Sequence, residues 1–164
     1  MRLLFFIVTF FCFINQTNAQ LIDSKFYGWT VYEIQPTELD EKKCYIASYP
    51  FDSKTNHNSR QTPYIMITRY QDSRTEEISI YGGFEYKIDS KIFFTIDEKQ
   101  FTLKTKENVA WAKSRQEDAL IIQSLLNGTI VKIRSDSSIG TFAVDEYTTK
   151  GIARAYSRMR EICI

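Results

Sequence analysis

The chain has 164 residues, with 21 basic and 20 acidic side chains, one histidine and three cysteines. Hydrophobic residues make up 43% of it and aromatic residues 15%, a content that supports a packed core and argues against disorder. The near-zero net charge argues against general nucleic-acid binding, because that binding depends on neutralising phosphates.

The first 19 residues have the layout of a cleavable secretory signal peptide. A short basic start precedes residues 3–14, which are apolar except for Thr9. A polar stretch follows, and the small residues Thr17 and Ala19 suit a signal peptidase, so we predict cleavage after Ala19. A transmembrane anchor would need about 20 apolar residues, which this run does not reach. A buried core segment is the remaining alternative.

The mature chain is then residues 20–164, a length typical of one domain. Removing the signal peptide removes one basic residue, Arg2, and leaves 20 basic and 20 acidic side chains. It also removes Cys12 and leaves Cys44 and Cys163, an even number in an exported chain. A bridge between them would close a loop of about 120 residues and contribute on the order of 4–5 kcal/mol. Two independent buried thiols are the alternative.

Most of the mature chain alternates apolar and polar residues with a period of two. β-branched and aromatic residues dominate these runs, as a half-buried strand prefers; examples are Trp29 and Val31, Ile65 and Ile67, Ile78 and Ile80, Phe94 and Ile96, Val131 and Ile133, and Phe142 and Val144. About nine strands in close succession predict antiparallel pairing, packed as a sandwich or a barrel. The polar residues 52–62 are predicted to form a loop.

Two segments have helical periodicity instead. Ser114 and Glu117 form a capping box, and apolar residues follow at helical spacing until Gly128. From Ile152 to Cys163 the apolar residues fall on one face of a second, terminal helix. That spacing turns Cys163 toward the core, where a strand carrying Cys44 could meet it.

The sequence offers little catalytic machinery. The single histidine, His57, lies in the polar 52–62 stretch and is predicted to be an exposed loop residue without a role, which argues against a histidine-based triad. There is no glycine-rich nucleotide motif, and zinc would need more cysteines and histidines. We therefore expect no cofactor and no metal. Carboxylate pairs suited in principle to acid–base chemistry occur at Glu76-Glu77, Asp97-Glu98, Glu117-Asp118 and Asp145-Glu146.

Two surface features remain as candidate interaction sites. Lys150, Arg154 and Arg158 line up at i, i+4 and i+8 on the terminal helix, a basic stripe that could meet an anionic partner or simply face solvent. Tyrosines are also numerous in the predicted strands and could form a recognition surface or serve only as strand formers; they are Tyr45, Tyr49, Tyr64, Tyr70, Tyr81 and Tyr86.

The order of several short motifs resembles that of the invasion-associated locus B proteins of bacteria. The matching pieces run through the whole mature chain: residues 26–31 (FYGWTV), 43–50 (KCYIASYP), 109–112 (VAWA), 138–141 (SIGT), 145–147 (DEY) and 150–155 (KGIARA), before Cys163. The resemblance implies an exported periplasmic or envelope-associated protein with an immunoglobulin-like β-sandwich, no established enzymatic activity and, in some members, a link to host-cell invasion. Many members carry more cysteines, one of them near the position of Tyr32.

Together, these features predict an antiparallel immunoglobulin-like β-sandwich with one inserted helix and a short C-terminal helix. The preferred function is a non-catalytic binding protein whose partner is an envelope or host protein, or an anionic surface component, and which neither binds nucleic acid nor spans the membrane. The alternative is a carboxylate-dependent periplasmic hydrolase, which would need two acids about 5–10 Å apart in a concave pocket.

The signal-peptide assignment predicts the form of the protein after export. Intact-mass measurement of the exported protein should give a chain that begins at Gln20, because the peptidase cuts after the small residue Ala19. A retained Met1 or a lipid adduct would contradict the assignment.

Overall fold

The structure, a computed structural model, describes residues 20–37 and 41–164; the predicted signal peptide lies outside these residues. The described part contains eleven strands and two helices, in the order β1 (Gln20–Phe26), β2 (Trp29–Ile34), β3 (Lys43–Ser48), β4 (Asp52–Thr55), β5 (Tyr64–Tyr70), β6 (Glu76–Tyr81), β7 (Ile92–Ile96), β8 (Lys99–Lys106), β9 (Val109–Trp111), α1 (Arg115–Asn127), β10 (Ile130–Asp136), β11 (Phe142–Thr148) and α2 (Ile152–Ile162).

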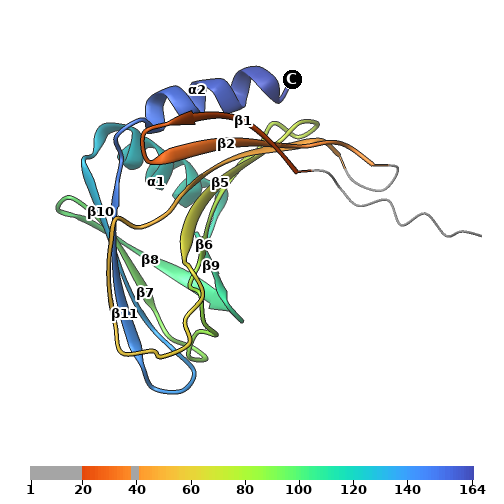
Figure 1. The fold of residues 1–164 in the computed structure, drawn as a ribbon. Helices are drawn as coiled ribbons and strands as arrows, with labels where there is room; N and C mark the ends of the chain where they lie inside the picture. The colour runs from red at the N-terminus through yellow and green to blue at the C-terminus, as the bar shows by residue number, and fades with distance from the viewer. Residues whose placement is uncertain (1–19, 38–40) are drawn as a thin grey trace, which may run out of the picture.

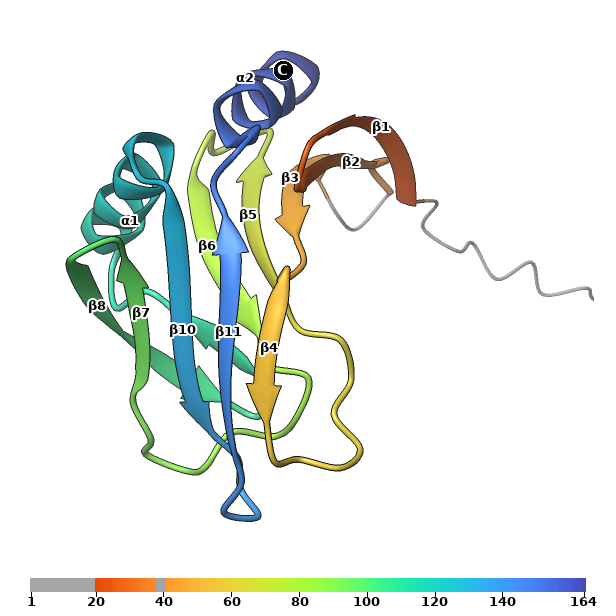
Figure 2. The same ribbon diagram turned by 60° about the vertical axis from the view of Figure 1, so that its left-hand side comes forward.

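All strand pairs are antiparallel, and the hydrogen-bonded order is β1-β2-β3-β5-β6-β9-β8-β7-β10-β11-β4. The sheet folds over itself into two layers (Figures 1 and 2). The first layer consists of β1, β2, β3, β5, β6 and β9, and the second of β7, β10, β11 and β4. Strand β8 belongs to both layers, because it pairs with β7 through residues 99–103 and with β9 through residues 104–106. The prediction of an antiparallel β-sandwich with an inserted helix and a C-terminal helix is therefore confirmed.

The inner face of the first layer forms the core. Val31, Ile46, Ile67 and Ile78 are direct neighbours across β2, β3, β5 and β6, and all four are fully buried. Apolar residues of β7, β8 and β10 in the second layer join the same cluster. Because side chains alternate along a strand, this register sends every second residue of the first layer to its outer face.

The two helices cover the part of the inner face that the second layer leaves open, α1 against β6 and α2 against β2 and β3 (Figure 2). Helix α1 has the predicted cap: the Glu117 amide donates to the Ser114 hydroxyl at 3.3 Å, and the Glu117 carboxylate accepts from the Lys113 amide at 2.6 Å. Helix α2 follows Gly151, whose φ of 96° lies in a region that glycine adopts readily because it has no Cβ. A Cβ there would lie 2.0 Å from the Phe26 carbonyl oxygen, so glycine allows α2 to approach the β1–β2 hairpin.

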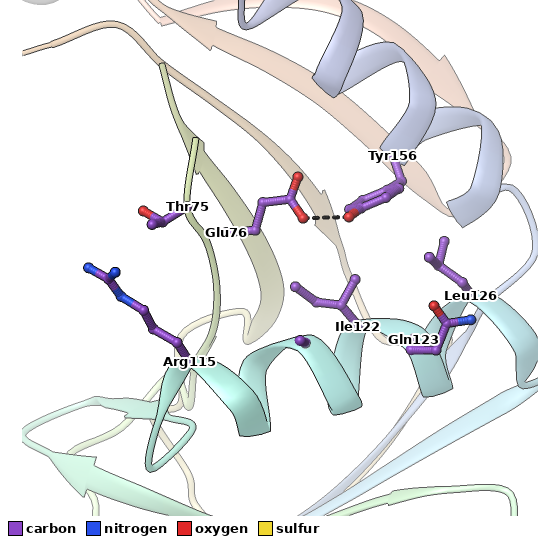
Figure 3. Close-up of a pocket in the computed structure, with 8 residues that line it drawn as sticks. Thr75, Glu76, Arg115, Ile122, Gln123, Leu126 and Tyr156 are labelled. Carbon is purple, nitrogen blue, oxygen red and sulfur yellow. Dashed lines mark hydrogen bonds between the residues drawn. The ribbon is translucent and has the colours of Figure 1, made fainter. Parts of the chain in front are cut away.

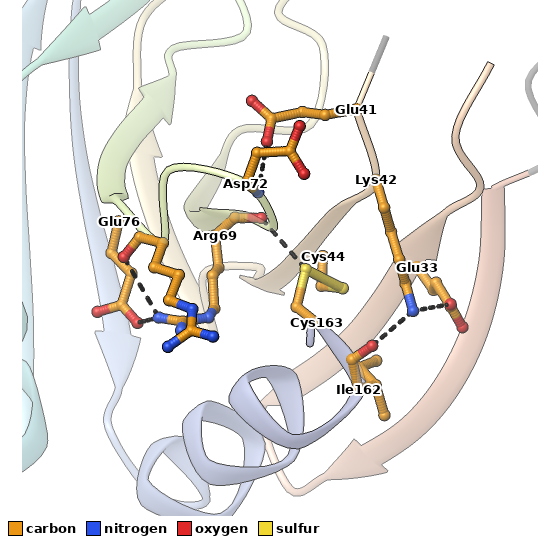
Figure 4. The surroundings of a disulfide bond; sticks show 10 residues. Glu33, Glu41, Lys42, Cys44, Arg69, Asp72, Glu76, Ile162 and Cys163 are labelled. Atoms are coloured by element: carbon orange, nitrogen blue, oxygen red, sulfur yellow. Dashed lines mark hydrogen bonds and ion pairs between the residues drawn. A yellow bond between two sulfur atoms is a disulfide. The ribbon is translucent and has the colours of Figure 1, made fainter. Parts of the chain in front are cut away.

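A disulfide joins β3 to the residue that follows α2, between Cys44 and Cys163, with Cα atoms 5.7 Å apart (Figure 4). Both cysteines are buried. Beside the bridge, the Lys42 ammonium donates to the Ile162 carbonyl at 2.6 Å and pairs with the Glu33 carboxylate at 2.8 Å. The predicted pairing is therefore present, and the end of α2 is fixed to the first layer by covalent and polar contacts.

A buried ion pair ties the two layers together at the other end. Arg60, in the β4–β5 connection, makes two parallel hydrogen bonds to Asp145 of β11, at 2.7 and 2.6 Å. Their side chains are only 5% and 2% exposed. Arg60 also donates to the Gly82 carbonyl, and its guanidinium lies over the Phe84 ring. Since breaking such a pair leaves a buried charge without its partner, both residues have a structural role in joining the layers.

Two predictions about the strands need correction. The structure contains eleven strands in its described part rather than about nine. The predicted 52–62 loop begins with strand β4, which pairs with β11 at the edge of the second layer. Its four residues, Asp-Ser-Lys-Thr, are all exposed, so this edge strand lacks the apolar alternation by which a half-buried strand is recognised.

The disulfide predicts a large stability effect. Cys44→Ala should lower the free energy of unfolding by about 2–5 kcal/mol, the range for loss of a native bridge. Urea denaturation of the variant and of the disulfide-bonded parent measures the difference. Non-reducing peptide mapping of the parent should recover the peptides of Cys44 and Cys163 as one linked pair, and two freely alkylated thiols in the native protein would contradict the bridge.

Candidate binding surface

Five tyrosines gather on the outer face of the first layer; we call this group the tyrosine face, and it consists of Tyr32, Tyr45, Tyr49, Tyr64 and Tyr81. The strand register produces it, because Tyr32 directly opposes Tyr45, and Tyr64 directly opposes Tyr81. The first pair stacks with ring centroids 4.7 Å apart and the second with centroids 5.1 Å apart. Tyr49, just after β3, meets Tyr64 edge-on at 6.1 Å.

The tyrosine face borders a depression of about 210 Å³ whose lining consists of Gln20, Tyr32, Tyr45, Ala47, Tyr49, Tyr64 and Met66. No lysine, arginine, aspartate or glutamate is among these described residues. Tyr32 and Tyr45, each 9% exposed, form its floor, whereas Tyr49 is 51% exposed. The arrangement therefore offers ring edges, the exposed ring of Tyr49 and hydroxyl groups to a ligand without offering a formal charge.

Three of the tyrosines on this surface have a raised pKa. Burial raises the pKa of Tyr45 above its ordinary value, and the neighbouring Tyr32 and Tyr49 raise it further. Burial is also the main cause that raises the pKa of Tyr32 and of Tyr64. At neutral pH the hydroxyls of these three residues are consequently neutral groups that can both donate and accept a hydrogen bond.

The structure brings together four of the six tyrosines that the sequence singled out and adds Tyr32. Tyr86 does not belong to the surface, because it is 3% exposed and packs in the core against Phe84. Tyr70 lies at the far end of β5, beside the Lys43 ammonium. The alternation of apolar residues in β2 places Tyr32 on the opposite side from Val31. Its position beside Tyr45 depends on the pairing of β2 with β3, which the periodicity of a single strand does not reveal.

The predicted basic stripe is not a continuous patch of free charge. Lys150 precedes α2, and its ammonium lies 4.3 Å from the centre of the Tyr27 ring. Arg158 makes two hydrogen bonds to Asp23 of β1, at 2.9 and 2.7 Å. Lys150 and Arg154 are both exposed, and no ion pair joins either of them to another described residue. Arg158 is instead paired with Asp23, so its charge holds α2 against β1. The use of the three residues as an interaction surface stays a prediction.

His57 also differs from the expectation of an exposed loop residue. It is half-buried, and its ring stacks on that of Phe84 with centroids 5.3 Å apart. Within the described part of the chain, its Nδ1 has no hydrogen-bond partner. The contact comes from a loop folding back over a distant segment, which the polar local sequence could not indicate. The arrangement places no nucleophile or orienting acid at hydrogen-bonding distance from the ring in the residues described.

A cleft of about 300 Å³ lies between the two helices, and α1 contributes to it the apolar side chains of Ala119, Ile122 and Leu126 (Figure 3). Glu76 forms its polar end. The Glu76 carboxylate accepts a hydrogen bond from the Tyr156 hydroxyl and pairs with Arg69 at 2.7 Å and with Arg160 at 3.5 Å. Since partners surround this carboxylate, its role is to hold α2 near β6.

The other predicted carboxylate pairs also contain members engaged in structural bonds. Asp97 accepts from the Thr129 hydroxyl and the Ile130 amide, and Asp118 accepts from the Ile78 amide. Asp118 nevertheless lines one pocket of about 290 Å³ together with Glu77. Burial raises the pKa of both groups, and Asp118 raises that of Glu77 further. Two acids from different elements therefore share a concavity.

Several other kinds of site find no counterpart in the described residues. The described residues contain no group of three or more histidine, cysteine, aspartate or glutamate side chains placed to hold a metal ion. Within residues 20–37 and 41–164, neither helix combines the length and the apolar character needed to cross a bilayer.

Comparisons with known proteins add no relative. No protein-family model matches the chain, and no curated protein or solved structure is detectably similar to it.

The Arg158–Asp23 pair predicts a difference between two neighbouring arginines. Arg158→Gln should lower the thermal midpoint more than the matched change Arg154→Gln, because only Arg158 joins α2 to β1. Arg158 lowers the pKa of Asp23 from 3.8 to about 2. The ionised Asp23 carboxylate stabilises the folded protein above pH 3.8, and this contribution is lost as the pH falls toward 2. The difference in thermal midpoint between Arg158→Gln and the parent should therefore become smaller over this range. Equal midpoints for both variants at neutral pH would contradict the role assigned to Arg158.

Proposed function

We propose that this protein is a non-catalytic, exported binding protein and that the tyrosine face is its binding surface. The observation that carries the proposal is the cluster of five tyrosine rings on neighbouring strands, four of which line an uncharged depression. Tyrosine combines a rigid ring with a polar tip and loses little conformational entropy when it is immobilised, which makes it effective in recognition.

The sequence supports the cellular setting of this proposal. The predicted signal peptide and the disulfide both fit an oxidising compartment outside the cytoplasm. The resemblance to invasion-associated locus B proteins points the same way, toward the bacterial periplasm or envelope and toward interaction with an envelope or host component. The partner follows from the surface rather than from the family, since fold likeness alone does not determine function.

The choice of surface rests on how the other charged groups are used. Arg60, Arg69 and Arg158 all pair with carboxylates of other elements. Isolated surface charges such as Arg154 contribute little directional recognition compared with a cluster of aromatic side chains. The strand pairing thus assembles the tyrosine face, and no ion pair that stabilises the fold occupies it.

Hydrolysis by carboxylates is the second candidate, and the shared pocket of Glu77 and Asp118 is the observation that favours it. A raised pKa suits a general acid. Asp118, however, already accepts the Ile78 amide at 3.0 Å, which fits a structural role for this buried residue. Glycan hydrolysis that is lost in Glu77→Gln would replace the binding proposal with this one.

The proposal predicts which variants lose a partner. Immobilised protein should capture a component of bacterial envelope extract, and Tyr49→Ala together with Tyr64→Ala should abolish the capture by removing ring area from the depression. The matched control, Lys150→Glu together with Arg154→Glu, should leave it unchanged. Quantitative mass spectrometry of the captured material measures both results. The reverse pattern, loss only in the charge variants, would contradict the proposal.

A further inference from the structure

Three members of the tyrosine face form a row across the strands. Tyr81, Tyr64 and Tyr49 come from β6, β5 and the residue after β3, which are neighbours in the sheet. Their successive centroids are 5.1 and 6.1 Å apart. The row therefore advances by about one strand spacing, 4.7–4.9 Å, or slightly more per ring. A chain-like ligand made of small rigid units can contact one ring after another along such a row.

The chemistry of the row excludes strongly charged ligands. The depression beside it has no cationic or anionic lining residue in the described chain. Proteins that bind single-stranded nucleic acid combine stacking aromatics with a positively charged groove, and anionic lipid head groups attract clusters of lysine and arginine. Neither arrangement is found around this depression, so complementarity of charge favours a neutral ligand.

The size of the accessible surface favours a slender ligand over a protein. A stable protein interface buries about 800 Å² on each partner. Here Tyr32 and Tyr45 are almost covered, Tyr64 and Tyr81 are half-buried, and only Tyr49 is more than half exposed. Ring edges and hydroxyls around a depression of about 210 Å³ fit a narrow ligand better than a broad, flat one.

A sugar chain has the required properties. One face of a pyranose presents C–H groups, which can lie against the exposed ring of Tyr49. Tyr64 and Tyr81 stack on each other and contribute ring edges and hydroxyls. The hydroxyls on the rim of the pyranose can exchange hydrogen bonds with the tyrosine hydroxyls and with Gln20, because a few placed polar groups fix the orientation of a ligand in a pocket. We propose that the tyrosine face binds an uncharged glycan chain, laid across β3, β5 and β6; this inference rests on the proposed binding function.

Isothermal titration of the purified protein tests this assignment with cellohexaose, maltohexaose and hexa-N-acetylchitohexaose as neutral probes and heparin as an anionic one. At least one neutral hexasaccharide should bind, with an affinity that changes little between low and high salt, because no charges are paired. Tyr49→Ala should weaken that binding about tenfold or more, equivalent to about 1.4 kcal/mol. Tyr27→Ala, which removes an exposed tyrosine outside the tyrosine face, is the matched control and should bind as the parent does.

The outcomes separate this inference from the proposed function. Binding of none of the neutral probes, or salt-sensitive binding of heparin alone, overturns the glycan assignment. If capture from envelope extract still depends on Tyr49 and Tyr64 in that case, the binding function stands and its partner is not a neutral glycan of the kinds tested. Binding of a neutral probe that is equally weakened by Tyr27→Ala and Tyr49→Ala also overturns the inference, because the site then lies elsewhere.

Discussion

The register of β2, β3, β5 and β6 is the constraint on which both the core and the candidate site depend. In a strand, the side-chain period is two, so one register decides which residues are buried and which face outward. The register that stacks Val31, Ile46, Ile67 and Ile78 inside also pairs tyrosines outside. A slip of one residue in any strand would bury tyrosine hydroxyls and expose isoleucines, so selection for a stable core preserves the surface as well.

Cross-links between distant segments explain why charge is scarce on that surface. The disulfide and the Lys42 contacts fix the end of α2, the Glu76 network holds α2 near β6, and Arg60 with Asp145 joins the layers. All of these interactions lie on the inner side of the first layer or at its ends. Around the depression, the outer face has tyrosines, Gln20, Ala47 and Met66, which can contact a ligand without having to break an ion pair.

The sequence was informative where the determining signal is local. The capping box of α1, the apolar face of α2 and the alternation of the central strands all depend on residues a few positions apart. The number of cysteines left after the predicted signal peptide pointed to Cys44 and Cys163. Long-range contacts carried no such signal. Strand β4 is polar on both sides, His57 is covered by Phe84 from another segment, and the partner of Arg158 lies in β1. The tyrosine face combines both kinds of signal. The number of tyrosines in the sequence suggested such a surface, but only the pairing of the strands determines which tyrosines belong to it.

The central claim is that ligand contact occurs on the outer face of the first layer and not on the helices. Hydroxyl-radical footprinting, read out by mass spectrometry with and without bound envelope material, tests it most directly, because it reports the accessibility of each tyrosine side chain. The account predicts that modification of Tyr49, Tyr64 and Tyr81 falls when ligand is bound, whereas that of Tyr27 is unchanged. Protection of α2 or of Tyr27, with Tyr49 and Tyr64 modified as before, would contradict it.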